Sequence, residues 1–285
     1  MVVAGVHVSI AGSLDQAAGR AVERGCDCFQ IFTKNPRGWA AKVITDQDAA
    51  AFRNAVSASS LQPIFAHMPY LPNLASEKPE MYRKSVDALV LELQRCSLLG
   101  IPYLVTHLGH AGDDTGLGRD RVVSAVLQAF DQDSSDVTLL LENTAGERNS
   151  VGSRLEEIAT VLNGIGDKSR TGICFDTCHA FAAGYDLRTP DAVSSVAEQI
   201  DTLFGLSRIA LIHLNDAKGA CGSGLDRHEH IGCGSIGEHG IAAVLQHPGF
   251  NKIPVICETP VDDRRGDAEN IAVVRRLEAE VFQNV

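Results

Sequence analysis

Eight short apolar runs, separated by longer amphipathic stretches, constrain the fold of this chain most strongly. The runs have the length and β-branched character of buried parallel strands. They cover Val3–Val8, Cys28–Phe32, Pro63–His67, Tyr103–His107, Val137–Glu142, Gly172–Asp176, Arg208–His213 and Ile253–Glu258. Eight strands that alternate with helices in a chain of 285 residues predict an α/β fold, a (β/α)8 TIM barrel, as a single domain over residues 1–285.

The stretches between these runs show the spacing of apolar residues that is typical of amphipathic helices. Most of them open on Ser, Asp, Thr or Pro, which helix starts prefer. The predicted helices are Leu14–Arg24, Pro79–Leu99, Arg119–Phe130, Arg154–Leu162, Pro190–Leu206, Ile236–Gln246 and Ala268–Phe282.

Several features indicate where the protein works. No run approaches the roughly 20 apolar residues of a membrane span, and the first 13 residues contain no Lys or Arg of the kind that opens a signal peptide. The eight cysteines are scattered and form no CxxC pair, so we expect reduced thiols rather than a structural zinc cluster. We therefore expect a cytoplasmic, monomeric protein that does not bind membranes.

Six successive runs end in a residue type that binds metal ions. These residues are His67, His107, Glu142, Asp176, His213 and Glu258. The carboxyl ends of all strands in a βα barrel gather at one rim, so the six side chains would converge in one cleft. A single histidine at a strand end is more often a hydrogen-bonded structural residue, but six in the same position are hard to attribute to chance. Imidazoles and carboxylates together suit zinc or manganese.

Two further motifs enlarge this set to nine residues. In DTCHAFAAGYD, His179 follows Asp176 by three residues, and DRHEH supplies Asp226 and His228. A catalytic zinc takes about three protein ligands plus water, so nine candidates favour two or three metals that share a bridging carboxylate. Residues near the strand ends or ligand loops could orient the ligands or cap loops, namely His7, Gln30, His110 and His230.

The net charge of −11 argues at first against a nucleic-acid partner, since such proteins usually carry a basic patch. The four carboxylates among the nine residues bring four negative charges, and three divalent ions would bring six positive charges. The filled site would then be near +2, which could attract a phosphate although the chain as a whole is acidic.

With these motifs in place, the chain resembles the endonuclease IV family. The resemblance rests on motifs that occur in the family's order over nearly the whole chain: HVSIAGSL, FTKNPRGW, THLGH, LENTAG, DTCHAFAAGYDLRTP, HLNDAKG, DRHEHIGCGSIG and ICET. It implies a βα barrel with three zinc ions per chain, with manganese as a possible substitute at one site. By resemblance, Glu142 would be the catalytic residue that bridges two of the metals.

The resemblance also assigns the other ligands. His67 and His107 would hold the first zinc, Asp176, His213 and Glu258 the second together with Glu142, and His179, Asp226 and His228 the third.

The function implied by the resemblance is that of an apurinic/apyrimidinic endonuclease of base excision repair. Such an enzyme hydrolyses the phosphodiester bond 5′ to an abasic site, leaves a 3′-hydroxyl and a 5′-deoxyribose phosphate, and trims blocked 3′ ends. Its partner would be double-stranded DNA with abasic sites or blocked 3′ ends.

Arg37, Tyr70 and Leu71 are similar to side chains that family members insert into the duplex. Inserted apolar and Arg groups can replace lost base stacking. The alternatives are that Tyr70 and Leu71 only pack a loop and that Arg37 pairs with a carboxylate.

Two rival functions remain at this stage. Metal-dependent sugar isomerases and epimerases on related barrels also place His, Glu and Asp at strand ends, but they need fewer ligands. A non-catalytic DNA-binding or metal-storage protein would instead be expected to show basic patches or cysteine clusters. The third ligand set and the FTKN and HMPYL loops favour the nuclease.

Overall fold

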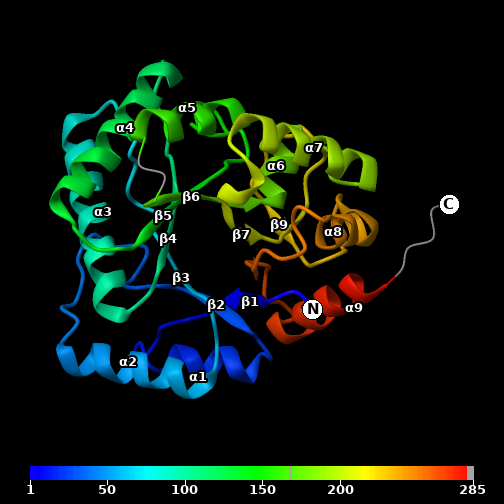
Figure 1. Cartoon of the computed structure of the whole chain (residues 1–285), viewed down its shortest axis with the longest axis horizontal. Coiled ribbons are helices and arrows are strands. Elements are labelled where there is room, and N and C mark those ends of the chain that lie inside the picture. Colours follow the sequence, from blue (N-terminus) through cyan, green and yellow to red (C-terminus); the bar gives the residue numbers. More distant parts are fainter. Residues whose placement is uncertain (167–168, 281–285) are drawn as a thin grey trace.

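The predicted barrel is confirmed in the computed structural model, which describes residues 1–166 and 169–280. Eight parallel strands close in the order β1-β10-β7-β6-β5-β4-β3-β2, with helices around them (Figure 1). The strands are β1 (Ala4–His7), β2 (Cys28–Phe32), β3 (Ile64–His67), β4 (Tyr103–His107), β5 (Thr138–Glu142), β6 (Thr171–Asp176), β7 (Ile209–His213) and β10 (Val255–Cys257). The predicted start of the last strand at Ile253 was wrong by two residues: Pro254 has no N–H to contribute to the ladder.

All seven predicted helices are present, α3 with the predicted bounds and the others with one or both ends shifted. The helices are α1 (Gln16–Glu23), α2 (Asp46–Ser59), α3 (Pro79–Leu99), α4 (Thr115–Gln132), α5 (Leu155–Ile165), α6 (Thr177–Ala183), α7 (Pro190–Leu203), α8 (Gly237–Gln246) and α9 (Asp267–Ala279). The predicted end of α7 at Leu206 was wrong, because Gly205 adopts a φ of 87° that stops the helix. The end that we predicted for the last helix, Phe282, lies outside the described residues.

The helix α2 was not among the predicted helices. It begins with a capping box, in which the Thr45 side chain accepts from the Asp48 N–H and the Asp48 side chain accepts from the Thr45 N–H. Only Ala49 and Phe52 are buried in its 14 residues, so its apolar pattern is weak. The sequence signal for α2 is therefore the capping box at its start and not the periodicity of its apolar residues.

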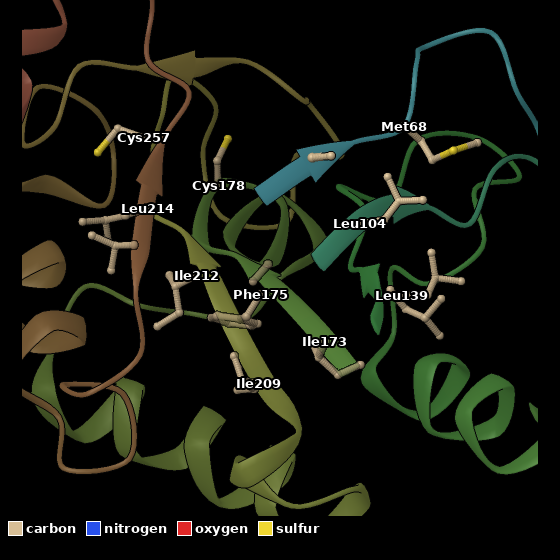
Figure 2. Close-up of a cluster of buried hydrophobic side chains, with 14 of the residues drawn as sticks. Met68, Leu104, Leu139, Ile173, Phe175, Cys178, Ile209, Ile212, Leu214 and Cys257 are labelled. Carbon is tan, nitrogen blue, oxygen red and sulfur yellow. The ribbon is translucent and has the colours of Figure 1, made fainter. Parts of the chain in front are cut away.

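The side chains of the strands form two apolar layers, one inside the barrel and one between the strands and the helices. The inner layer fills the barrel with one side chain from each of seven strands: Cys28, Phe65, Val105, Leu140, Cys174, Leu211 and Ile256. The outer layer packs between strands and helices, and Figure 2 shows part of it around β6 and β7, including Ile173, Phe175 and Ile212. Because strand side chains alternate, residues two positions beyond the inner layer also point into the barrel. These positions hold the six predicted strand-end residues, from His67 to Glu258.

Two further expectations can be compared with the structure. All eight cysteines lie in the described part of the chain and are free thiols, most of them buried. Within residues 1–166 and 169–280, no helix is both long enough and apolar enough to cross a membrane.

Candidate metal centre

Glu142, the last residue of β5, lies at the centre of the strand-end cluster and is completely buried. Its Oε2 atom is 3.1 Å from His67 Nε2 and 3.2 Å from His107 Nε2. Its Oε1 atom is 2.9 Å from His213 Nδ1. The two carboxylate oxygens thus face two different groups of potential ligands, which is the arrangement that a bridging carboxylate requires.

The second group combines Glu142 with Asp176, His213 and Glu258. One ligand atom from each of these four residues lies within 4.8 Å of those of the others. His213 Nδ1 is 3.3 Å from Glu258 Oε2 and 3.9 Å from Asp176 Oδ2. Three of the four end a barrel strand, and Glu258 follows the end of β10 by one residue.

The third group lies beside the second and comes from a helix and a loop. The Asp176 side chain accepts a hydrogen bond from the His179 N–H and so begins α6 directly after β6, which turns His179 back toward the cluster. A short antiparallel pair, β8 (Asp216–Ala217) and β9 (His228–Glu229), positions His228. His179 Nε2 is 3.2 Å and His228 Nε2 is 3.5 Å from Asp226 Oδ1.

Hydrogen bonds outside the cluster fix the proton positions of three imidazoles. The Nδ1 atoms of His67, His179 and His228 each lie against a backbone carbonyl oxygen. The acceptors are the carbonyls of Met68, Asn143 and Glu258, at 2.7, 2.9 and 3.0 Å, respectively. A carbonyl oxygen can only accept, so Nδ1 carries a proton and Nε2 is the ring nitrogen that is directed into the cluster.

His213 is held in the opposite sense. Its Nε2 atom donates to Gln30 Oε1 at 2.9 Å, so Nδ1 is the ring nitrogen that faces Glu142 and Glu258. The same Gln30 side chain donates through Nε2 to Glu258 Oε1 at 2.7 Å and lies 3.0 Å from His7 Nδ1. Gln30 and His7 thus belong to the group that orients the cluster, as the sequence allowed.

His228 provides a test of whether these residues fit a metal ion. Its Nε2 atom is buried and has no hydrogen-bond partner among the described residues. Asp226 Oδ1 and Asp176 Oδ2 lie 3.5 and 3.8 Å away. A buried, unpaired acceptor that faces two carboxylates is costly unless another group satisfies it. A divalent cation satisfies all three groups at once, so the donor set fits zinc.

Two asparagines that sequence reasoning missed support the carboxylates. Asn215 Nδ2 donates to Asp176 Oδ2 at 2.7 Å, and its Oδ1 accepts from the Glu258 N–H at 2.8 Å. Asn143 exchanges two hydrogen bonds with the backbone of Asp176, at 2.7 and 2.9 Å. Both are fully or almost fully buried. The available signal was their place in LEN and HLN, one and two residues after a strand-end residue.

The remaining histidines that we considered as orienting groups lie farther out. His230 is buried, with Nε2 3.1 Å from Asp262 Oδ1 and Nδ1 3.2 Å from Asn270 Nδ2, so it ties loops together. His110 is exposed, and its backbone rather than its imidazole bonds to Asn73. Neither contacts the nine clustered residues through a hydrogen bond among the described residues.

The metal-free cluster behaves as a set of ion pairs. Burial alone would raise the pKa of Glu142, but the charges of His107 and His213 outweigh burial and hold it well below the usual range. Burial would lower the pKa of His179, but the carboxylates of Asp176 and Asp226 outweigh it and hold the pKa well above its ordinary value. A metal ion that binds here must therefore displace protons.

The three predicted DNA-contact residues lie beside the cluster, not in it. The Tyr70 side chain is 65% exposed, and its ring stands edge-on to Phe32 with 5.1 Å between centroids. Leu71 is 36% exposed. Arg37 is exposed and forms no ion pair within residues 1–166 and 169–280, so the expected alternative of a carboxylate partner has no support in the structure. A cleft of about 440 Å³ joins Tyr70 to the clustered histidines.

Known proteins are similar to this chain in sequence and in fold. The family described as Xylose isomerase-like TIM barrel matches residues 18–277. Probable endonuclease 4 of Methanoculleus marisnigri is 60% identical over 97% of this chain and 99% of that protein. The crystal structure of endonuclease IV from Thermus thermophilus superposes with a TM-score of 0.86 at 36% identity, over 96% of this chain and 98% of that one.

A more distant structural likeness concerns the fold alone. The crystal structure of a D-tagatose 3-epimerase-like protein superposes with a TM-score of 0.73 over 97% of both chains, at 20% identity. Barrels of this type therefore occur in proteins with very different sequences, and the residues at the rim must distinguish between functions.

Proposed function

The chain belongs to the endonuclease IV family, and from this premise we propose that it is a zinc-dependent apurinic/apyrimidinic endonuclease of base excision repair. It would hydrolyse the phosphodiester bond 5′ to an abasic site in double-stranded DNA, leaving a 3′-hydroxyl and a 5′-deoxyribose phosphate. It would also trim blocked 3′ ends. The observation that carries the proposal is Glu142, whose two oxygens face two separate groups of ligand atoms.

Three zinc ions would be held by the three groups of residues, with manganese possible at one site. The groups are His67, His107 and Glu142; then Glu142, Asp176, His213 and Glu258; then His179, Asp226 and His228. When bound, zinc lowers the pKa of water to about 7 and neutralises charge on phosphate oxygens, which provides a nucleophile near neutral pH and favours the departure of an alkoxide.

The protein's own residues prepare this site before DNA arrives. Glu142 keeps a negative charge at a fully buried position and would be the catalytic residue because its two oxygens would each bind a metal. Backbone carbonyls and Gln30 keep one nitrogen of each imidazole directed inward, so no rotation would be needed for metal to bind. This preorganisation supports hydrolysis without a histidine base.

Recognition of DNA would come from the loops beside the cleft. Tyr70 and Leu71 present apolar surface to solvent, and Arg37 has no counter-charge among the described residues. DNA that lacks a base bends easily, and an inserted side chain replaces the lost stacking. All nine metal-binding candidates come from one chain, so we propose that the monomer is sufficient for activity.

The rival proposal, a sugar isomerase or epimerase, shares with this chain only the fold, which the epimerase-like protein has at 20% identity. A small sugar would not need the third group of His179, Asp226 and His228, nor an exposed aromatic side chain beside the cleft. The two proposals therefore differ in metal number and in substrate size, and both differences can be measured.

The decisive experiment is incision of a labelled duplex that contains one abasic-site analogue, without added magnesium. The protein is assayed as purified, after metal removal by a chelator, and after zinc is restored, with metal content measured at each stage. We expect a single cut 5′ to the lesion that disappears with the metal and returns with zinc. A folded protein with restored zinc that leaves the duplex intact would contradict the proposal and direct attention to sugar substrates.

A further inference from the structure

The segment that carries Arg37, residues 33–44 between β2 and α2, lies over a cavity of about 280 Å³. Both ends of the segment and its middle contribute to the lining, including Thr33, Lys34, Ala40 and Val43. The cavity leaves this part of the segment without close packing against the rest of the protein. The polar groups that bond to the segment are therefore the contacts that can fix its shape.

Two buried cations provide these contacts. Lys34 is only 5% exposed, and its Nζ atom donates to the carbonyl oxygens of Gly38 and Trp39, both at 2.9 Å. Arg95 on α3 is 7% exposed and donates through Nη1 to the Lys42 carbonyl at 2.8 Å. Arg95 also donates to Thr33, through Nε to the hydroxyl at 2.7 Å and through Nη2 to the carbonyl. The guanidinium thus connects the two ends of the segment.

Glu92 supplies the counter-charge under this loop. It is fully buried, lies one turn before Arg95 on α3, and accepts from the Thr33 hydroxyl through Oε2. Its other oxygen, Oε1, has no hydrogen-bond partner in the described part of the chain. Burial raises the pKa of Glu92 and lowers that of Lys34, so each charge is held at a cost.

Such a cluster is hard to explain by stability. Buried ion pairs can often be replaced by well-packed apolar residues without loss of stability, because desolvation cancels most of the attraction. Their directional hydrogen bonds, in contrast, specify one geometry. The cluster has no hydrogen bond or ion pair to the nine metal-binding candidates among the described residues, so its effect is directed at the loop.

We propose that Glu92, Arg95 and Lys34 are positioning residues that hold the Arg37 loop in the shape that discriminates abasic from intact duplex. This inference rests on the proposed function, since it assumes that Arg37 contacts DNA. The loop is also connected to Tyr70, whose N–H donates to the Pro36 carbonyl at 3.1 Å. A displaced loop would therefore move both recognition elements while the metal cluster stays intact.

The only tryptophan of the chain, Trp39, lies in this loop and allows a test that does not depend on activity. Its side chain is 37% exposed, and its carbonyl accepts from Lys34. The first variant is Arg95→Lys, which keeps the positive charge but loses the planar guanidinium that donates to both Thr33 and Lys42. The matched control is Arg170→Lys, which removes another largely buried guanidinium; it precedes β6, is paired with Asp133 and is not among the groups that bond to residues 33–44.

We expect Arg95→Lys to increase acrylamide quenching of Trp39 in the metal-loaded, DNA-free protein, whereas Arg170→Lys should not. The preference for abasic over intact duplex in binding should fall by roughly tenfold, since misplaced contacts act on substrate binding. Zinc content and hydrolysis of the small diester bis(p-nitrophenyl) phosphate should remain as in the wild type. Glu92→Gln keeps an oxygen for Thr33 and should have a smaller effect than Arg95→Lys.

A second variant, Lys34→Met, keeps the proposal testable if Arg95→Lys does not fold. It retains the aliphatic chain, loses both donors to the loop and should also increase Trp39 quenching. Unchanged quenching and an unchanged abasic preference in the folded variants would overturn the proposal. If the wild type does not cut abasic DNA, the proposed function fails, while the quenching result still decides whether these residues hold the loop.

Discussion

The metal-binding candidates and the DNA-contact loops lie side by side but are built differently. Glu142, Asp176 and His213 are completely buried at strand ends, and hydrogen bonds fix the orientation of each. Tyr70 and Arg37 are exposed, and the loops that carry them are held by backbone hydrogen bonds and, for the Arg37 loop, by the buried charged groups of Lys34 and Arg95. The candidate metal ligands are thus fixed by the barrel itself, whereas the proposed DNA-contact residues depend on loops that other side chains hold in place.

The largest effect is expected when the bridging carboxylate is removed. Glu142→Gln replaces the negatively charged carboxylate by a neutral amide, which binds two cations poorly. Loss of an outer hydrogen-bond partner of a metal ligand costs about 10–100-fold, so loss of the bridging ligand should reduce incision by more than about 100-fold. Incision rate, zinc content and thermal unfolding are measured together. Near-normal incision by this variant would remove Glu142 from the mechanism.

A smaller effect, on zinc affinity, is expected when a residue that supports the metal-binding candidates is changed. Asn215→Asp keeps the shape of the side chain but turns the donor that faces Asp176 Oδ2 into a second carboxylate oxygen. We expect zinc affinity to fall by roughly 10–100-fold, measured by competition with a chromophoric chelator. Asn270→Asp alters another buried amide that is bonded to Thr259 and serves as the control. Equal losses in both variants would mean that general destabilisation, not the metal cluster, is responsible.

Substitutions in the loops beside the cleft should change the affinity for DNA rather than the zinc content or the rate of hydrolysis. Tyr70→Ala removes the exposed ring beside the cleft, and stacking on a base is worth about 1–3 kcal/mol, so affinity for abasic duplex should fall by roughly tenfold. Affinity for intact duplex should change less, and zinc content should not change. Tyr70→Phe keeps the ring and should preserve the preference. A residue that only packs its loop would instead lower the unfolding temperature and weaken both complexes equally.

The same contrast explains how much could be predicted from the sequence. Six of the nine clustered residues were identified because the ends of barrel strands share one rim, which is a general rule. The other three came from the DTCH and DRHEH motifs and the division into three groups from the family resemblance, and the structure brings ligand atoms of all nine together in these groups. The eight strands were also confirmed. A local sequence pattern is sufficient to predict where a side chain lies when a general rule relates that pattern to the three-dimensional fold.

Of the orienting groups, His7 and Gln30 were suggested by their places near strand ends, but the asparagines and the residues under the Arg37 loop could not be predicted in this way. Asn215 bonds to residues 39 and 43 positions away, and no periodicity connects them. The roles of Glu92 and Arg95 also depend on a loop far earlier in the chain, with sequence separations of 59 and 62 residues to Thr33. Such contacts follow from tertiary packing, so they become visible only when the strands and helices are placed.

The smallest effect is expected for Arg37, and it is the one that separates insertion from simple charge attraction. If Arg37 contacts a phosphate, Arg37→Ala should weaken binding to all duplexes by a few-fold and reduce the salt dependence of binding by about 0.9 in log–log slope. If the guanidinium instead fills the gap at the lesion, the slope should stay constant and only the abasic preference should fall. Arg37→Lys, which keeps the charge but not the planar group, distinguishes the two outcomes: a phosphate contact is preserved, whereas an inserted guanidinium is lost. Wild-type affinities and salt dependence in both Arg37→Ala and Arg37→Lys, on abasic and on intact DNA, would show that this exposed arginine takes no part in binding.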